Sequence, residues 1–221
     1  MFDFSPQGLQ RAVLRVVILL MSLCVHEFAH AWMAWRLGDD TAARQGRLTL
    51  NPFAHADPVG TYLLPLMGAP IGWAKPVPFS PGRFRRDVSM GFGTLLVKGA
   101  GPSANVVLAV VAAIVLGLLA RFVPDVVERG SGGLALLLQL VTTNIGLALF
   151  NLLPIHPLDG GGVADYFVPR ALRPTWERIS AAGPFLLIAV IVLASRTGFL
   201  SGTIYALADA VLRVSSFLAG V

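Results

Sequence analysis

Long apolar runs dominate the sequence and limit what it can fold into. They occupy residues 9–37, 90–123, 133–153, 179–195 and 199–218. A helix needs about 20 apolar residues to cross the hydrocarbon layer of a bilayer. Only 13% of the chain is charged, whereas about a quarter is typical of soluble domains. We therefore expect an all-α polytopic bundle in a membrane, with residues 1–221 as a single domain. For the last run, which contains Asp209 and Arg213, the sequence leaves open whether it spans or lies in the interface.

The segment between the first two runs has a different character. It is rich in Gly, Pro and basic residues, and its apolar part at 59–71 is too short and too broken to span. Residues 47–50 and 73–79 are extended in character, and we expect them to pair as strands. Non-helical backbone at membrane depth must be shielded by protein or line a wet cavity. The sequence thus predicts about five to six membrane segments and a small β-strand-containing re-entrant insertion.

Basic residues lie mainly in the connections between the apolar runs. A net charge of +5 is compatible with nucleic-acid binding, but this scattered distribution favours a lipid surface and no nucleic-acid partner. Lys and Arg are most frequent in residues 36–98, an excess that is typical of cytoplasmic connections. We expect this connection, and the side to which the site opens, to be cytoplasmic in the cell membrane. Cys24 is the only cysteine, so an internal disulfide is impossible.

Two histidines and a glutamate lie within the first apolar run. His26 and His30 are four residues apart, so a helix presents both imidazoles on one face, where they can bind one metal ion, and zinc suits this spacing. Glu27 is then placed to act as general base on a water held by the metal. The alternative is a chance match to a short pattern. However, each ionisable residue in a spanning helix costs roughly 2.5 to 3.5 kcal/mol to insert, and a metal ion offsets that penalty.

A catalytic zinc usually has three protein ligands, so a third ligand is needed. Asp159 is the best candidate. It follows Pro154 and Pro157, which break a helix, and precedes three glycines at 160–162, which permit close approach of backbone. A carboxylate presented there can reach into the bundle. The alternative is a loop aspartate that only caps the next turn.

With these residues in place, the sequence resembles the site-2 protease family of intramembrane zinc metalloproteases. The resemblance rests on residues 26–30, 51–61, 100–105 and 151–161. It implies one zinc ion per chain held by His26, His30 and Asp159, water activation by Glu27, and cleavage of peptide bonds in or near transmembrane segments of membrane proteins. No stretch outside the apolar core is long enough for a PDZ domain or a CBS pair, so a minimal catalytic core is expected.

Three further residues are candidates for contact with substrate. Asn151 matches a family position expected to contact substrate or hold the scissile carbonyl, and capping of the broken helix is its alternative role. For Asn105 an interhelical hydrogen bond is the simpler explanation. His55 lies in a resembling stretch and is a candidate for shaping the site or its access, although a turn histidine bonded to Asp57 explains it more simply. His156, between two prolines, is compatible with a purely local structural role.

Two other functions compete with proteolysis. A metal transporter would use the same ligands for transit but needs no general base beside them, and a pseudoprotease would bind without catalysis. Glu27 therefore favours hydrolysis over both. The sequence patterns leave the substrate and the oligomeric state undetermined.

Overall fold

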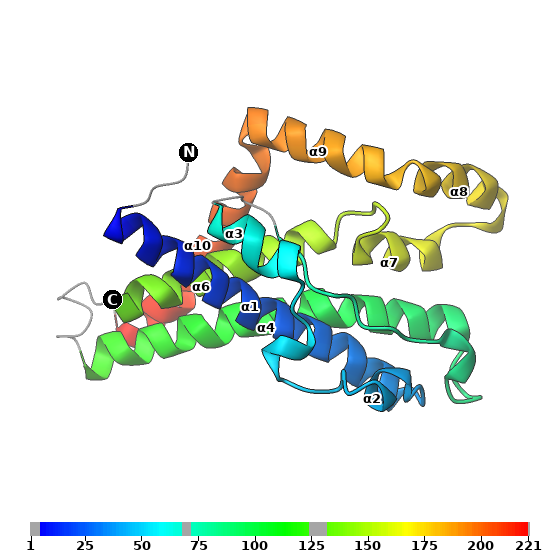
Figure 1. Cartoon of the computed structure of the whole chain (residues 1–221), viewed down its shortest axis with the longest axis horizontal. Coiled ribbons are helices and arrows are strands. Elements are labelled where there is room, and N and C mark those ends of the chain that lie inside the picture. The colour runs from blue at the N-terminus through cyan, green and yellow to red at the C-terminus, as the bar shows by residue number, and fades with distance from the viewer. Residues whose placement is uncertain (1–4, 68–71, 124–131, 221) are drawn as a thin grey trace.

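The computed structural model describes residues 5–67, 72–123 and 132–220, which form helices joined by loops (Figure 1). The long helices are α1 (Pro6–Arg36), α4 (Met90–Phe122), α6 (Gly132–Asn151) and α10 (Phe199–Ala219). The shorter helices are α7 (Asp159–Phe167), α8 (Arg173–Ala181) and α9 (Gly183–Thr197). Short helical turns lie in the connections, namely α2 (Thr41–Arg44), η1 (Pro52–Ala54), η2 (Pro58–Leu63), α3 (Leu64–Leu66), η3 (Pro81–Arg83) and η4 (Arg170–Leu172).

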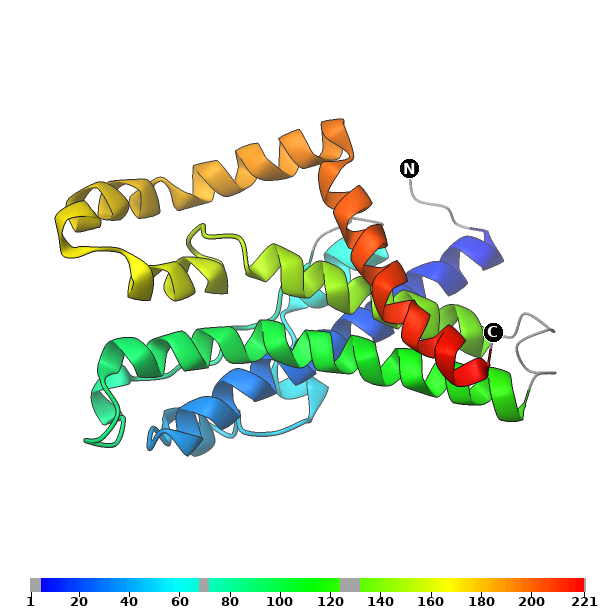
Figure 2. The ribbon, with the colours of Figure 1, turned by 180° about the vertical axis from the view of Figure 1, so that it is seen from behind.

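Helix α4 lies at the centre of the described bundle and packs against α1, α6, α7 and α10. Figures 1 and 2 show α1 and α10 on opposite sides of the pair formed by α4 and α6. Small side chains line these contacts, including the buried residues Ala109, Ala112, Ala113 and Ala208. Because lipid tails are as apolar as helix surfaces, membrane helices associate through the close packing that small side chains allow. The core therefore has the composition expected of a helix bundle in lipid.

Local sequence signals set the ends of α1. The Ser5 hydroxyl accepts a hydrogen bond from Gly8 N at 3.0 Å, and Pro6 occupies the first turn, where its missing N–H is not needed. At the other end, Gly38 has a φ of +105°, a conformation that other residues rarely adopt. These ends place His26 and His30 in the C-terminal half of α1.

Among the described residues, four helical segments are long and apolar enough to cross a membrane, namely Pro6–Arg36, Met90–Phe122, Gly133–Asn151 and Phe199–Ala219. Residues 170–181 and 183–197 form a fifth candidate that is bent by 66°. Of the predicted five to six segments, the described residues thus supply four or five, and residues 58–66 form only short helical turns. Residues 68–71, the end of the predicted re-entrant stretch, lie outside the described residues. Large apolar side chains such as Phe217, which is 82% exposed, cover the outer helix surfaces, as expected where lipid is the solvent.

The predicted strands at 47–50 and 73–79 were wrong, since no strand occurs in the part of the chain that the structure describes. Pro76 and Pro78 have no N–H, so one edge of the second segment lacks donors for a β-ladder. Between them, the N–H of Val77 donates to a side-chain carboxylate at 2.9 Å. The segment is therefore an extended loop held by separate hydrogen bonds, and the described fold is entirely helical.

Candidate metal centre

Two imidazoles on α1 meet across one helical turn. His26 and His30 are 4% and 7% exposed, and their Nε2 atoms lie 3.0 Å apart. The four-residue spacing places both side chains on the same face of the helix. Their Nε2 atoms therefore converge on one buried position beside α1.

A carboxylate from a distant part of the chain joins them. Asp159 begins α7, and its Oδ2 lies 3.1 Å from Nε2 of His26 and 3.1 Å from Nε2 of His30. Gly160 permits this placement, because a Cβ there would lie 2.3 Å from Leu153 O, where the chain leaves α6. Three buried side chains with metal-ligating atoms are thus brought to one point.

The hydrogen-bond partners of the two imidazoles determine where their hydrogens lie. His30 Nδ1 is 2.7 Å from Val97 O, and a carbonyl only accepts, so this Nδ1 carries a hydrogen. His26 Nδ1 is 2.6 Å from Oδ1 of Asn105, which likewise only accepts. In neutral imidazoles the two Nε2 atoms therefore present lone pairs to each other and to Asp159.

This arrangement fits a bound cation. When both imidazoles are neutral, two Nε2 atoms and one carboxylate oxygen lie within 3.1 Å of one another and all three present lone pairs. Such groups repel one another unless a positive charge lies between them. Imidazole nitrogen and carboxylate oxygen are usual ligands of zinc, and three protein ligands with an open fourth position are typical of catalytic zinc sites. The residues present therefore fit a zinc ion.

Gly101 of α4 forms one wall of the cluster. A Cβ on this residue would lie 2.4 Å from Nε2 of His30 and 2.6 Å from Nε2 of His26. Real Cβ atoms do not approach other atoms so closely. Only glycine leaves space here for the two nitrogens and an ion bound to them.

Glu27 is buried next to the cluster, with 8% of its surface exposed. Its Oε2 accepts a hydrogen bond from Val77 N at 2.9 Å. This hydrogen bond fixes the orientation of the Glu27 carboxylate beside the two histidines. The extended loop at 73–79 thus positions Glu27.

Lys98 is a residue of the site that the sequence analysis missed. Its Nζ lies 3.1 Å from Oδ1 of Asp159, whereas the other carboxylate oxygen, Oδ2, faces the two histidines. Because Lys98 occupies one carboxylate oxygen, we expect Asp159 to bind a metal ion through the other oxygen, Oδ2, alone. A signal was present in the sequence, because a lysine in a spanning helix needs a partner and Lys98 stands three residues before Gly101.

The two asparagines occupy different positions. Asn105 is fully buried behind His26, a placement that favours an interhelical role over contact with substrate. Asn151 is the last residue of α6, and its Nδ2 donates to Leu147 O of the same helix at 3.0 Å. Asn144, fully buried and bonded to Asn105 at 2.7 Å, had no motif that could have identified it.

The two remaining histidines lie outside the cluster. His55 is 1% exposed, and its Nε2 donates to Thr49 O at 2.9 Å rather than to Asp57, which caps η2. Burial lowers the pKa of His55 and keeps the ring neutral. His156 lies 3.1 Å from the carboxylate of Asp165. Both are involved in local structure around the loops.

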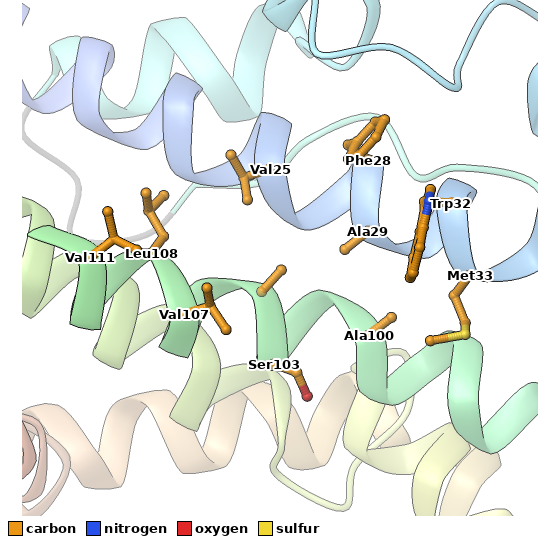
Figure 3. Close-up of a pocket in the computed structure, with 11 residues that line it drawn as sticks. Val25, Phe28, Ala29, Trp32, Met33, Ala100, Ser103, Val107, Leu108 and Val111 are labelled. Carbon is orange, nitrogen blue, oxygen red and sulfur yellow. The ribbon is translucent and has the colours of Figure 1, made fainter. Parts of the chain in front are cut away.

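An apolar groove of about 450 Å³ runs between α1 and α4 (Figure 3). Its described lining consists of Val25, Phe28, Ala29, Trp32, Met33, Ala100, Ser103, Ala104, Val107, Leu108 and Val111. These side chains include none of the clustered residues and offer no acid, base or strong metal ligand. The groove is suited to contact with hydrocarbon and is distinct from the metal centre.

Several curated relatives match most of the chain. "Putative zinc metalloprotease YwhC" of Bacillus subtilis is 37% identical over 178 residues, which are 80% of this chain and 79% of the relative. "Putative zinc metalloprotease Rip2" of Mycolicibacterium smegmatis is 36% identical over 79% of this chain and 64% of the relative. The Rip2 protein of Mycobacterium tuberculosis is 32% identical over 86% of this chain and 71% of the relative. No family model and no solved structure match the chain.

The chain belongs to the site-2 protease family. Like other site-2 proteases it is a multi-pass integral membrane protein, as its four or five candidate spans indicate. In this site-2 protease the histidine pair lies on α1, a candidate span, and Asp159 begins α7, which packs against α4.

Proposed function

We propose that the protein is an intramembrane zinc metalloendopeptidase of the site-2 type, which hydrolyses peptide bonds in or near transmembrane segments of membrane proteins. The observation that carries this proposal is the meeting of three buried lone-pair donors beside Glu27 on a helix apolar enough to span. Relatives named as zinc metalloproteases support it. We also propose that residues 1–221 form one catalytic domain that holds one zinc ion.

The side chains divide the chemistry among them. His26, His30 and Asp159 would hold zinc through two Nε2 atoms and Oδ2. When bound, zinc supplies a Lewis acid that polarises a carbonyl and lowers the pKa of water. Glu27 accepts a proton from the attacking water and passes it to the departing amine nitrogen. The water oxygen thereby replaces that nitrogen on the carbonyl carbon.

Hydrolysis requires water at a depth from which lipid excludes it. The cluster lies in the C-terminal half of α1, the half that leads into the Lys- and Arg-rich residues 36–98. Such an excess is typical of cytoplasmic connections. We therefore propose that the site opens toward the cytoplasmic side of the cell membrane.

The decisive variant is Glu27→Gln, which preserves size and removes the base. We expect cleavage of single-span peptides in detergent to fall by about a hundredfold or more, while zinc content from metal analysis stays unchanged. Glu177→Gln, at an exposed position on α8, is the matched control and should cleave at the parent's rate. A chelator should abolish cleavage by the parent, and added zinc should restore it.

A metal transporter would give the opposite result. Zinc uptake into vesicles would then be equal for the parent and Glu27→Gln, and neither would cleave any peptide of the panel. Cleavage by Glu27→Gln at the parent's rate would also refute the proposal.

A further inference from the structure

A closed hydrogen-bond network extends from His26 to the middle of α6. Asn105 Oδ1 accepts from His26 Nδ1 at 2.6 Å, and Asn105 Nδ2 donates to Asn144 Oδ1 at 2.7 Å and to Ser22 O at 3.3 Å. Asn144 Nδ2 donates to Ser22 Oγ at 2.9 Å and to Leu140 O at 2.8 Å. Ser22, Asn105 and Asn144 are fully buried, at 0% exposure. Both hydrogens of each amide group are thus used.

Two backbone carbonyls give this network a single direction. Leu140 O can only accept, so the NH₂ group of Asn144 must face it, and Oδ1 of Asn144 must face Asn105. Ser22 O favours the same orientation of Asn105, but only from 3.3 Å, so the shorter bond from Asn105 Nδ2 to Asn144 Oδ1, at 2.7 Å, is the stronger constraint on Asn105. Oδ1 of Asn105 is left facing His26, and it requires an N–H from Nδ1.

We propose that Asn144, acting through Asn105, is a positioning residue that fixes the hydrogen of His26 on Nδ1 and so keeps Nε2 available for a metal ion. The opposite tautomer would place the hydrogen on Nε2, where it would prevent coordination. A buried hydrogen bond to the second ring nitrogen of a metal-binding histidine fixes its tautomer and orientation. The inference rests on the proposed zinc site, but it concerns the ring before metal arrives.

The first test measures the tautomer directly. The chain has four histidines, so the ¹⁵N spectrum of a histidine-labelled, zinc-stripped sample is simple, and His26→Gln identifies the His26 signals. Protonated and bare ring nitrogens have well-separated shifts. We expect His26 Nδ1 to be protonated in the parent at pH 8 and a mixture of tautomers to appear in Asn144→Leu. A bare Nδ1 in the parent would overturn the proposal.

The second test measures zinc affinity by competition with a chelator. We expect Asn144→Leu to bind zinc about 10- to 100-fold more weakly than the parent. Thr142→Val is the matched control, because its hydroxyl bonds only to carbonyls of its own helix, Leu138 O and Gln139 O. It should bind zinc within about threefold of the parent, since it does not touch the histidine. Equal losses in both variants would reduce Asn144 to a structural role.

A third variant bypasses the network. In Asn105→Asp the carboxylate can only accept from His26 Nδ1, so it needs no orientation by Asn144. In that background, adding Asn144→Leu should change zinc affinity by less than about threefold. A full additional loss would contradict the coupling. If the parent bound no zinc, the proposed function would be refuted. The ¹⁵N spectrum of the zinc-free protein would still show whether Asn144 fixes the tautomer of His26.

Discussion

A methyl group added at Gly101 would collide with both imidazoles, because it would lie 2.4 Å from Nε2 of His30 and 2.6 Å from Nε2 of His26. We predict that Gly101→Ala loses most bound zinc and all measurable cleavage. Alanine favours a helix over glycine by about 0.5 to 1 kcal/mol, so helix α4 itself should not be weakened. Metal analysis and thermal unfolding in detergent measure the two effects separately.

Gly99 provides the control for this prediction. It lies on the same helix, and a Cβ built on it would meet nothing within 4 Å apart from the neighbouring residues and backbone of the helix itself. Gly99→Ala should therefore retain zinc and activity. Retention of full zinc occupancy by Gly101→Ala would show that the cluster does not bind the ion where we place it.

For Asn151 we predict an effect on the reaction rather than on the fold. Its amide bonds to Leu147 O within α6, so a catalytic role requires that the side chain leave this bond when substrate is present. Loss of one oxyanion donor typically reduces turnover about a hundredfold or more, whereas loss of a helix cap costs about 1 kcal/mol of stability. Cleavage rate, zinc content and thermal stability of Asn151→Ala should therefore show a large loss in the first alone.

Thr142→Val is also the control for Asn151, because it removes a comparable bond to the backbone of α6. A slow Asn151→Ala variant with lowered stability or lost zinc would return this residue to helix capping. Unimpaired cleavage would remove its catalytic role.

At the scale of elements, one buried carboxylate anchors the C-terminal end of the extended loop that holds Glu27. Asp39, at 0% exposure, accepts hydrogen bonds from Ser80 N at the end of the loop and from Thr41 N at 3.0 Å. We predict that Asp39→Ala lowers the free energy of unfolding by about 3 kcal/mol, since buried donors lose a charged acceptor. The loop should also become sensitive to limited proteolysis, and cleavage activity should fall as Val77 shifts.

The neighbouring residue Asp40 provides the control for this prediction, because its carboxylate lies at the surface. Its exposed carboxylate pairs with Arg44 and Arg83, and the hydrogen bond from Arg44 lowers the pKa of Asp40. Exposed ion pairs contribute little to stability. Asp40→Ala should therefore unfold close to the parent's temperature, and an equal effect of both substitutions would argue against the loop anchor.

At the scale of the whole molecule, the length of α4 permits a test of orientation. Its 33 residues extend over roughly 50 Å, more than the hydrocarbon thickness of a bilayer. Arg86 and Val123, both exposed, lie just beyond its two ends. In a Cys24→Ser background, we predict that an impermeant thiol reagent outside intact cells labels Val123→Cys but not Arg86→Cys.

Labelling of Arg86→Cys from outside would reverse the proposed orientation. Disrupted cells provide the control, because both cysteines should then react. Labelling of both positions from outside intact cells would show that α4 does not cross the membrane.

Local patterns in the sequence were sufficient to predict the long helices and the pair of histidines on one helix face. Apolar runs longer than a bilayer is thick predicted α1, α4, α6 and α10, because helix formation in lipid depends on composition over one segment. The spacing of His26 and His30 sufficed to place them on one face, since helix geometry is the same everywhere. The strands failed because two prolines remove backbone donors, a feature already visible in the sequence at 76 and 78.

Only the tertiary structure decided which distant groups meet the histidines. Asp159, which the sequence offered as a candidate third ligand, lies 133 positions from His26, and the packing of α7 against α4 brings it to the histidines. The sequence indicated that Lys98 needs a partner but not which one, and Asn144 had no recognisable motif, because helix rotation and packing determine which side chains bond across helices. The sequence by itself therefore determined the candidate spans and the placement of His26 and His30 on one face of α1. Helix packing determined which residues lie opposite the two histidines, and the direction of the hydrogen bonds that run from Asn144 through Asn105 to His26.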